Sequence, residues 1–316
     1  MPQEPSLALY RHPFSRYLAA TRPAFLSVTL AGALIGLATA CFSGAQLSPL
    51  KAFLTVFFAL VAHAGANVVN DYYDALNGSD AANTDRLYPF TGGSRFIQNG
   101  VLTLAETRYF GYALLAAVIP PGIWLAINSA PGLIVIGIAG LAVAWAYSAP
   151  PLQLMSRGWG EGGIIAGWLL VVLGTDFVQR GAFAALPLVA GLPFALLVAA
   201  ILYINQFPDL AADRAAGKMT LVVRLGARRA GWGYWLLTMG AYGSLASSIL
   251  FGYLPPGSAV ALLPLLLSLH AGRQLLVHAE NPAQLTRAIR QTVAAANLHG
   301  VLLAAGLALS AGVCGV

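Results

Sequence analysis

Two short stretches of the sequence combine asparagine and aspartate at helical spacing. Each has an Asn, an Asp four residues later and a second Asp three or four residues beyond it, namely Asn67, Asp71 and Asp74, and then Asn205, Asp209 and Asp213. Residues three or four apart share one face of an α-helix, so each stretch presents its oxygen atoms together. Such hard ligands suit Mg²⁺, which binds a few carboxylates together with water and phosphate oxygens. We therefore predict that the four aspartates hold Mg²⁺ on one diphosphate, with the asparagines as further ligands or orienting groups.

Basic side chains and a flexible loop accompany both stretches. The cations that we expect to neutralise phosphate oxygens are Arg22, Arg86, Arg95, Lys218 and Arg224. Guanidinium and ammonium groups both suit this role. The segment Thr91-Gly92-Gly93-Ser94-Arg95 adds backbone donors that can approach an anion closely. These residues therefore predict a substrate that carries a diphosphate.

The composition is that of a membrane protein. Of the 316 residues, 58% are hydrophobic and 9% are charged, against about 25% charged in a soluble domain. The mean hydropathy is +0.74, and this much apolar surface requires lipid. The net charge of +6 does not indicate nucleic-acid binding, because no aqueous domain is present to carry a basic face.

Nine apolar runs are long enough to cross a bilayer as helices, at about 20 residues each. They cover roughly 24–43, 51–72, 107–128, 131–148, 160–179, 184–206, 230–252, 257–277 and 292–314. We therefore predict an all-α, polytopic bundle of nine transmembrane helices, in which residues 1–316 form a single integral membrane domain. Pro120 and Pro121 fall inside the third run and predict a kink there.

The distribution of basic residues predicts the orientation. If nine spans place alternate loops on opposite sides, all but two of the 17 Lys and Arg residues lie on one side, the exceptions being Lys51 and Arg180. The positive-inside rule then places the N-terminus in the cytoplasm and the C-terminus outside. Both Asn/Asp stretches lie on the cytoplasmic side. We therefore predict a multi-pass protein of the cell inner membrane with its active site toward the cytoplasm.

Several other polar residues have a simpler interpretation. His63 lies one turn before Asn67 and is expected to make a structural hydrogen bond to a neighbouring helix. Asp176 and Arg180 are four residues apart, which predicts a local ion pair. Asp80 is expected to be a solvated residue of a polar loop.

The two stretches resemble the Asp-rich motifs of the UbiA-type intramembrane prenyltransferases. The first reads Asn67-Val-Val-Asn70-Asp71-Tyr-Tyr-Asp74, and the second reads Asn205-Gln-Phe-Pro-Asp209-Leu-Ala-Ala-Asp213-Arg214-Ala-Ala-Gly217-Lys218. The resemblance covers most of the chain. It implies a nine-helix prenyltransferase fold and Mg²⁺-dependent transfer of a polyprenyl group from an isoprenoid diphosphate to an aromatic acceptor. It implies no obligate protein partner.

Within this family the sequence is most similar to the 1,4-dihydroxy-2-naphthoate polyprenyltransferase branch of menaquinone biosynthesis. The segments that carry the similarity are Asn77-Gly78-Ser79-Asp80, Thr84-Asp85-Arg86, Gly92-Gly93 and Arg157-Gly158-Trp159-Gly160-Glu161. The last segment follows Tyr147, and the resemblance implies substrate-binding roles for Tyr147 and Glu161. Gln206 and Pro208 depart from the Asn-Asn-x-Arg-Asp pattern of this branch, which removes one diphosphate contact.

The chemistry that the resemblance implies is ionisation of the allylic C–O bond followed by alkylation of an electron-rich ring. One alternative is a prenyltransferase that acts on a different phenolic or quinone-precursor acceptor. A more distant alternative is a multi-helix membrane transporter. Transporters bind their substrates near the bilayer midplane on broken helices, whereas the acids of this chain cluster at helix ends.

Overall fold

The computed structural model describes residues 3–311, which fold into helices without any strand. The α-helices are α1 (Pro13–Ala20), α2 (Ser27–Phe42), α3 (Pro49–Asn77), α4 (Ser79–Ala82), α5 (Leu104–Ala117), α6 (Ile119–Asn128), α7 (Gly132–Ala146), α8 (Gly160–Arg180), α9 (Leu186–Ala215), α10 (Leu221–Leu225), α11 (Ala227–Leu250), α12 (Leu265–His278) and α13 (Thr286–Ser310). Short 3₁₀ turns are η1 (Pro23–Leu26), η2 (Met155–Arg157), η3 (Pro256–Leu262) and η4 (Pro282–Gln284). The all-α prediction is confirmed.

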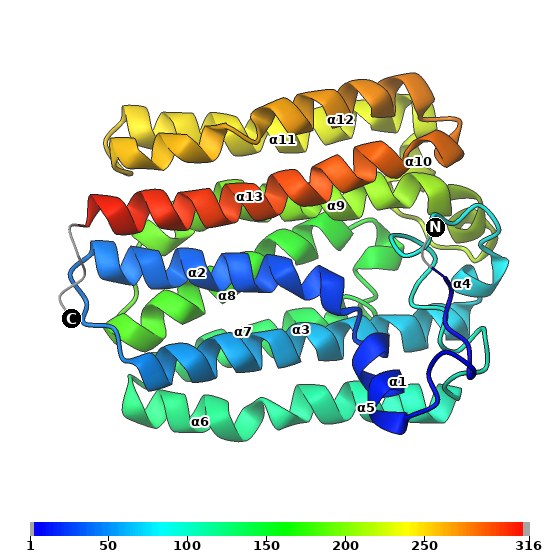
Figure 1. Cartoon of the computed structure of the whole chain (residues 1–316), viewed down its shortest axis with the longest axis horizontal. Coiled ribbons are helices and arrows are strands. Elements are labelled where there is room, and N and C mark those ends of the chain that lie inside the picture. Colours follow the sequence, from blue (N-terminus) through cyan, green and yellow to red (C-terminus); the bar gives the residue numbers. More distant parts are fainter. Residues whose placement is uncertain (1–2, 312–316) are drawn as a thin grey trace.

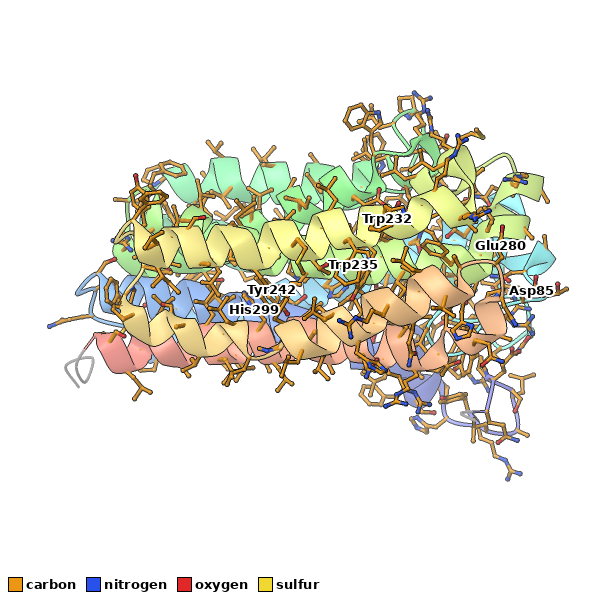
Figure 2. The ribbon with its side chains drawn as sticks, turned by 90° about the horizontal axis from the view of Figure 1, so that it is seen from above. Asp85, Trp232, Trp235, Tyr242, Glu280 and His299 are labelled. Atoms are coloured by element: carbon orange, nitrogen blue, oxygen red, sulfur yellow. The ribbon has the colours of Figure 1, made fainter. Side chains whose placement is uncertain are left out.

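The long helices lie roughly parallel to one another in a bundle (Figure 1). The short helices α4 and α10 and the loops around them gather at one end of it (Figure 1). Asp85 and Glu280 lie at this end, whereas Tyr242 and His299 lie midway along the helices (Figure 2). Polar connecting segments are therefore concentrated at one end, which we call the loop end.

Seven segments of the described chain are long and apolar enough to cross a membrane. They are Pro23–Phe42, Pro49–Asn77, Leu104–Asn128, Gly160–Arg180, Leu186–Ala215, Pro256–His278 and Thr286–Ser310. The apolar helix α7 is shorter, at 15 residues, and α11 is not among the seven. All nine expected runs coincide with helices up to residue 311, and residues 312–314 of the last run lie outside the described residues. The count of nine spans and the membrane orientation stay predictions.

The third run is interrupted close to the predicted position. The run divides into α5 and α6 at Val118, two residues before Pro120. Proline lacks the N–H that would continue the hydrogen-bond ladder, so the break falls in the turn that precedes it.

Helices α3 and α9 are longer than a bilayer requires. They have 29 and 30 residues, and the surplus of about ten residues over the roughly 20 that cross the hydrocarbon core adds about 15 Å. Ser48 caps the start of α3 and Gly78, at φ 81°, ends it at the loop end. In α9, Pro208 lies within the helix without ending it. The surplus turns carry the two Asn/Asp stretches.

Glycines allow α2 to pack closely against its neighbours. A Cβ atom added to Gly36 of α2 would lie 2.5 Å from the carbonyl oxygen of Val172 in α8. A Cβ added to Gly300 of α13 would lie 2.9 Å from the Cβ of Ala31. Small residues of this kind permit the close backbone approach on which helix packing in membranes depends.

The predicted ion pair between Asp176 and Arg180 is confirmed, and it lies at the end of the bundle opposite the loop end. Asp176 is fully buried. Its carboxylate accepts hydrogen bonds from Arg180 at 2.7 and 2.8 Å and from the Thr39 hydroxyl at 2.8 Å. Because Thr39 belongs to α2, the pair also ties α2 to α8.

We expect the Asp176→Asn substitution to lower the stability of the protein by about 1.5–3 kcal/mol, because it removes a buried charge that pairs with Arg180. The measurement is the midpoint of thermal unfolding in detergent. Asp85→Asn is the control, since Asp85 is exposed. Equal midpoints for the two variants would contradict the prediction.

Candidate active site

One cavity of about 610 Å³ joins the loop end of the bundle to its interior. Its polar lining residues include Arg22, Asn67, Asn70, Asp74, Asp80, Asn83, Tyr147, Asn205, Gln206, Asp209, Asp213 and Lys218. The rest of its lining is mainly apolar and comes mostly from α2, α3, α6, α7, α8 and α9. The two Asn/Asp stretches, far apart in the sequence, therefore meet at one end of an otherwise apolar cavity.

Lys218 links the two stretches directly. Its Nζ lies 3.0 Å from Oδ1 of Asp74 and 3.3 Å from Oδ1 of Asp213. All three side chains are buried. Burial opposes the charged form of the lysine, but the two aspartates outweigh it and raise the pKa of Lys218 above its ordinary value. Lys218 therefore remains an ammonium between the two carboxylates.

Asn70 also lies in the site, although we did not single it out from the sequence. Its amide donates to Oδ2 of Asp74 at 3.1 Å and to the hydroxyl of Ser148 at 3.1 Å. The signal was present, because Asn70 precedes Asp74 by four residues, as Asn67 precedes Asp71. Asn67 itself donates to the carbonyl of Thr21 at 3.0 Å.

Asn83 connects the loop after α3 to the second stretch. Its amide donates to Oδ1 of Asp209 at 2.5 Å, a contact that the sequence did not predict. Two further oxygens of the second stretch, Oδ2 of Asp213 and Oδ1 of Asn205, are buried without a hydrogen-bond partner among the described residues. Buried polar atoms of this kind indicate a missing ligand or ion.

Asp71 lies just outside the cavity lining. It is 3% exposed, and its Oδ1 accepts a hydrogen bond from the backbone N–H of Ser94 at 3.2 Å. In this structure Asp71 thus holds the Gly92–Gly93 loop against α3. Its predicted role as a metal ligand stays a prediction.

The five predicted phosphate-binding cations occupy different positions. Arg22 and Lys218 line the cavity. Arg86 pairs with Glu4 at 2.7 Å, and this bond lowers the pKa of the Glu4 carboxyl. Arg95 donates to the backbone carbonyl of Asp80.

Arg224 also lies away from the cavity lining. It donates to the backbone carbonyls of Met219 and Arg157, each at 2.9 Å. Arg86, Arg95 and Arg224 therefore hold the loops around the site, whereas only Arg22 and Lys218 face its interior in the described structure.

The expectation that Asp80 is a solvated loop residue is wrong. Asp80 is 6% exposed and lines the cavity, and its Oδ2 has no hydrogen-bond partner among the described residues. Burial, with Asp74 and Asp71 nearby, raises its pKa well above the ordinary value. A Cβ at Gly93 would lie 2.2 Å from this oxygen. The Asp80 carboxylate can therefore occupy this position only because residue 93 has no side chain.

Tyr147 and Glu161 differ in position. Tyr147 lines the cavity at the end of α7. Glu161 is buried and accepts a hydrogen bond from Gln206 at 2.5 Å. Gln206 also accepts from the backbone N–H of Val222 at 3.3 Å, so it joins the starts of α8 and α10 to α9. A substrate-binding role for either residue stays a prediction.

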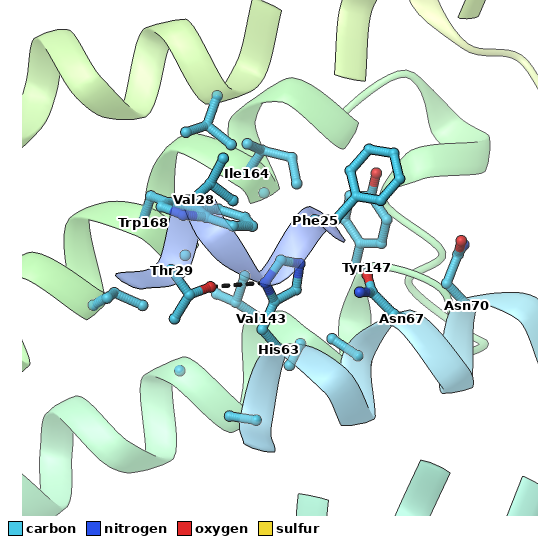
Figure 3. A pocket seen from close by; sticks show the side chains of 18 of the residues that line it. Phe25, Val28, Thr29, His63, Asn67, Asn70, Val143, Tyr147, Ile164 and Trp168 are labelled. Atoms are coloured by element: carbon cyan, nitrogen blue, oxygen red, sulfur yellow. Dashed lines mark hydrogen bonds between the residues drawn. The ribbon is translucent and has the colours of Figure 1, made fainter. Parts of the chain in front are cut away.

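His63 makes the expected structural hydrogen bond. Its Nδ1 lies 2.7 Å from the hydroxyl of Thr29 in α2, and its ring meets Trp168 edge to face at a centroid distance of 5.1 Å. Figure 3 shows His63 on the face of α3 that also carries Asn67. The histidine therefore lies in the cavity wall, one turn deeper than the polar cluster.

The polar end of the cavity has an excess of negative charge and suits Mg²⁺. Of the described residues that line it, Asp74, Asp80, Asp209 and Asp213 outnumber the cations Arg22 and Lys218. No three His, Cys, Asp or Glu side chains within residues 3–311 stand close enough to hold an ion by themselves. Mg²⁺ that binds phosphate substrates commonly uses one or two carboxylates together with phosphate oxygens, and the aspartates at this end of the cavity supply that number.

The sequence comparison identifies the family. A family model described as the UbiA prenyltransferase family matches residues 25–298. The chain belongs to this family. It is therefore a prenyltransferase, and the transporter alternative is set aside.

Relatives within the UbiA family point to one branch. The 1,4-dihydroxy-2-naphthoate octaprenyltransferase of Escherichia coli is 28% identical over 302 residues, covering 93% of this chain and 95% of that protein. The Mycobacterium leprae protein of the same name is 31% identical over 217 residues, covering 67% and 70%. A solved structure of a UbiA homolog from Archaeoglobus fulgidus bound to DMAPP and Mg²⁺ matches with a TM-score of 0.66 at 16% identity, covering 94% and 99%. The similarity of folds, together with the apolar helices, makes this chain a multi-pass membrane protein.

We expect Asp80 to make stability depend on pH. The pKa of Asp80 is higher in the folded protein than its ordinary value of 3.8, so the folded state binds the proton more tightly than the unfolded state does. Proton binding by Asp80 therefore stabilises the folded state at low pH, and this stabilisation is lost as the pH rises above 3.8. In EDTA, the Asp80→Asn variant should therefore gain stability relative to wild type as the pH is raised from about 5 to about 8. Thermal unfolding at each pH measures this difference. A wild-type pH profile parallel to that of Asp80→Asn would contradict it.

Proposed function

We propose that this UbiA-family enzyme transfers a polyprenyl group from an isoprenoid diphosphate to 1,4-dihydroxy-2-naphthoate, as in menaquinone biosynthesis. The observation that carries the proposal is a continuous cavity that joins an acidic polar cluster to an apolar interior. A polyprenyl diphosphate has the complementary form, with a charged head and an apolar tail. The naphthoate acceptor is supported by relatives of that name over most of the chain.

The acidic residues hold the charged head. Asp74, Asp209 and Asp213 would hold Mg²⁺ together with diphosphate oxygens, and Asp71 would join them or support them from behind the Gly92–Gly93 loop. Asn67 and Asn205 would orient the same oxygens. Bound Mg²⁺ supplies Lewis-acid stabilisation of the negative charge that develops on the leaving diphosphate.

Two cations of the chain act on the same charge. Lys218, held between Asp74 and Asp213, presents an ammonium group to the cavity. Arg22 lines the cavity from the start of η1. Both stabilise the diphosphate more strongly as its allylic C–O bond breaks, so they lower the barrier to ionisation. Arg86, Arg95 and Arg224 position the loops and do not contact the head.

The ring of the acceptor then forms a bond to the allylic carbon. The electron pair for the new C–C bond comes from the ring, and the carboxylate on that ring carbon leaves as CO₂, which restores aromaticity. The apolar walls exclude water that would otherwise capture the cation. Tyr147 and Glu161, near the polar end, would contact or support the acceptor.

The enzyme would lie in the inner membrane with its loop end in the cytoplasm. The loop end carries the basic residues Arg86, Arg95, Arg224, Arg228 and Arg229, as the positive-inside rule requires of a cytoplasmic face. Both water-soluble reaction partners, the diphosphate head and the naphthoate, would then reach the site from the cytoplasm.

The test is a membrane assay with radiolabelled polyprenyl diphosphate, 1,4-dihydroxy-2-naphthoate and Mg²⁺. Wild type should form the prenylated quinol, demethylmenaquinol, only with Mg²⁺, and oxygen in air then oxidises it to the demethylmenaquinone that is counted. The Asp71→Ala and Asp209→Ala variants should lose more than about 100-fold of the rate, because even outer-shell partners of a bound metal are worth 10–100-fold. Asp85→Ala, from the same loop but exposed, is the matched control and should retain activity.

Two results would change the proposal. Turnover with 4-hydroxybenzoate or another phenol, but not with the naphthoate, would retain the site and replace the acceptor. Wild-type rates in both aspartate variants would show that these carboxylates do not hold the reacting head.

A further inference from the structure

A second cavity lies where α11 begins and α12 ends. It has a volume of about 590 Å³, and its charged and aromatic lining residues are Arg228, Arg229, Trp232 and Glu280. None of these residues lines the active-site cavity. Trp232 and Glu280 both lie on the loop-end side of Trp235 (Figure 2). The second cavity is therefore separate from the active site, although it lies toward the same end of the bundle.

Charges of both signs line the second cavity without pairing. Arg228 and Arg229 belong to the first turn of α11, and Glu280 follows the end of α12. All three side chains are exposed. Within residues 3–311 none of them forms an ion pair or a side-chain hydrogen bond. Two guanidinium groups and one carboxylate therefore remain available to a ligand that carries both charges.

Trp232 adds an aromatic ring to the same cavity. It follows Arg228 by four residues and Arg229 by three, so the three side chains are neighbours on the surface of α11. Its side chain is 66% exposed. An indole ring attracts an ammonium group to its face, and tryptophan is enriched where a membrane protein meets the lipid headgroups.

The surface beside the cavity, toward the middle of the bundle, is apolar. Leu236 of α11 is 77% exposed and Val277 of α12 is 74% exposed. Large apolar side chains this exposed face lipid chains in a bilayer. Within about two turns of α11 the surface thus changes from guanidinium groups to hydrocarbon. The second cavity therefore lies at the level of the lipid headgroups.

We propose that the second cavity binds the headgroup of phosphatidylethanolamine, a phospholipid that carries both a phosphate and an ammonium group. The phosphate contacts Arg228 and Arg229, because guanidinium groups donate paired hydrogen bonds to phosphate oxygens. The ammonium group contacts the carboxylate of Glu280 and the ring of Trp232. The acyl chains lie along the exposed apolar surface of α11 and α12.

Glu280 distinguishes this headgroup from those of other phospholipids. An anionic headgroup such as that of phosphatidylglycerol would contact the arginines but would place its negative charge beside the carboxylate. A choline headgroup is positively charged but has no N–H group to donate. The ammonium of ethanolamine has three N–H donors, like that of lysine. Ethanolamine therefore satisfies both the cations and the carboxylate of the cavity.

The experiment compares three dioleoyl phospholipids that differ only in their headgroup, which is ethanolamine, choline or glycerol. Each lipid is titrated into the purified full-length protein in detergent, and native mass spectrometry measures the apparent Kd of the tightest-bound lipid. Wild type should bind the ethanolamine lipid at least about fivefold more tightly than the other two, the scale of one charge contact at a membrane surface. No prenyl substrate is present, so the result does not depend on the proposed function.

Variants separate the contacts to the two parts of the headgroup. Arg228→Gln and Arg229→Gln should each weaken binding of the ethanolamine lipid by about fivefold. Glu280→Gln should reduce the preference for ethanolamine over choline by about fivefold and should strengthen binding of phosphatidylglycerol. Arg273→Gln is the matched control, because Arg273 is an exposed arginine of α12 that does not line the cavity. It should retain the wild-type order of affinities.

Four results would overturn the inference. Wild type could bind the ethanolamine and choline lipids equally, or Glu280→Gln could keep the full preference for ethanolamine. Tightest binding of phosphatidylglycerol by wild type would show a basic surface that attracts anionic lipids and has no site for an ammonium group. A loss in Arg273→Gln as large as that in Arg228→Gln would show a general effect of net charge.

Discussion

The buried contact of Lys218 with Asp74 and Asp213 is the interaction on which the site depends. Burying a charged carboxylate is unfavourable unless a cation lies next to it. In this structure the ammonium group of Lys218 contacts one carboxylate from α3 and one from α9. The pairing fixes the end of α9 against the end of α3. Because Lys218 lies in the turn after α9, it also fixes the position of α10 and the loop that precedes it.

The remaining loops are arranged around this contact. Asn83 bonds Asp209, Ser94 bonds Asp71, and Arg86 bonds Glu4, so the segment after α3 is attached to both helices and to the N-terminal segment. These polar loops cover the loop end of an otherwise apolar cavity. The sharp change from charge to hydrocarbon along one cavity explains why a single molecule with a charged head and an apolar tail fits it, and why water is kept from the interior.

The fold and the acidic centre could be predicted from particular residues. The apolar runs predicted the helices. The spacing of Asn67, Asp71 and Asp74 predicted that they share a helix face, because helical periodicity depends only on the local chain. The roles of the arginines could not be predicted in this way. Arg86 and Arg224 have the same chemistry as Arg22, and only the folded arrangement of their neighbours separates loop-holding residues from those that face the cavity.

The position of Asp80 also could not be predicted from the local sequence. A polar loop sequence predicts solvation, yet Gly93 and the end of α3 enclose this carboxylate in the site. The sequence by itself determined that the chain is a helical membrane protein with two acidic helix ends, since hydropathy and spacing are local properties. Only the tertiary structure decided which cation lies between those ends and which loop carboxylate joins them, because these depend on contacts between segments far apart in the chain.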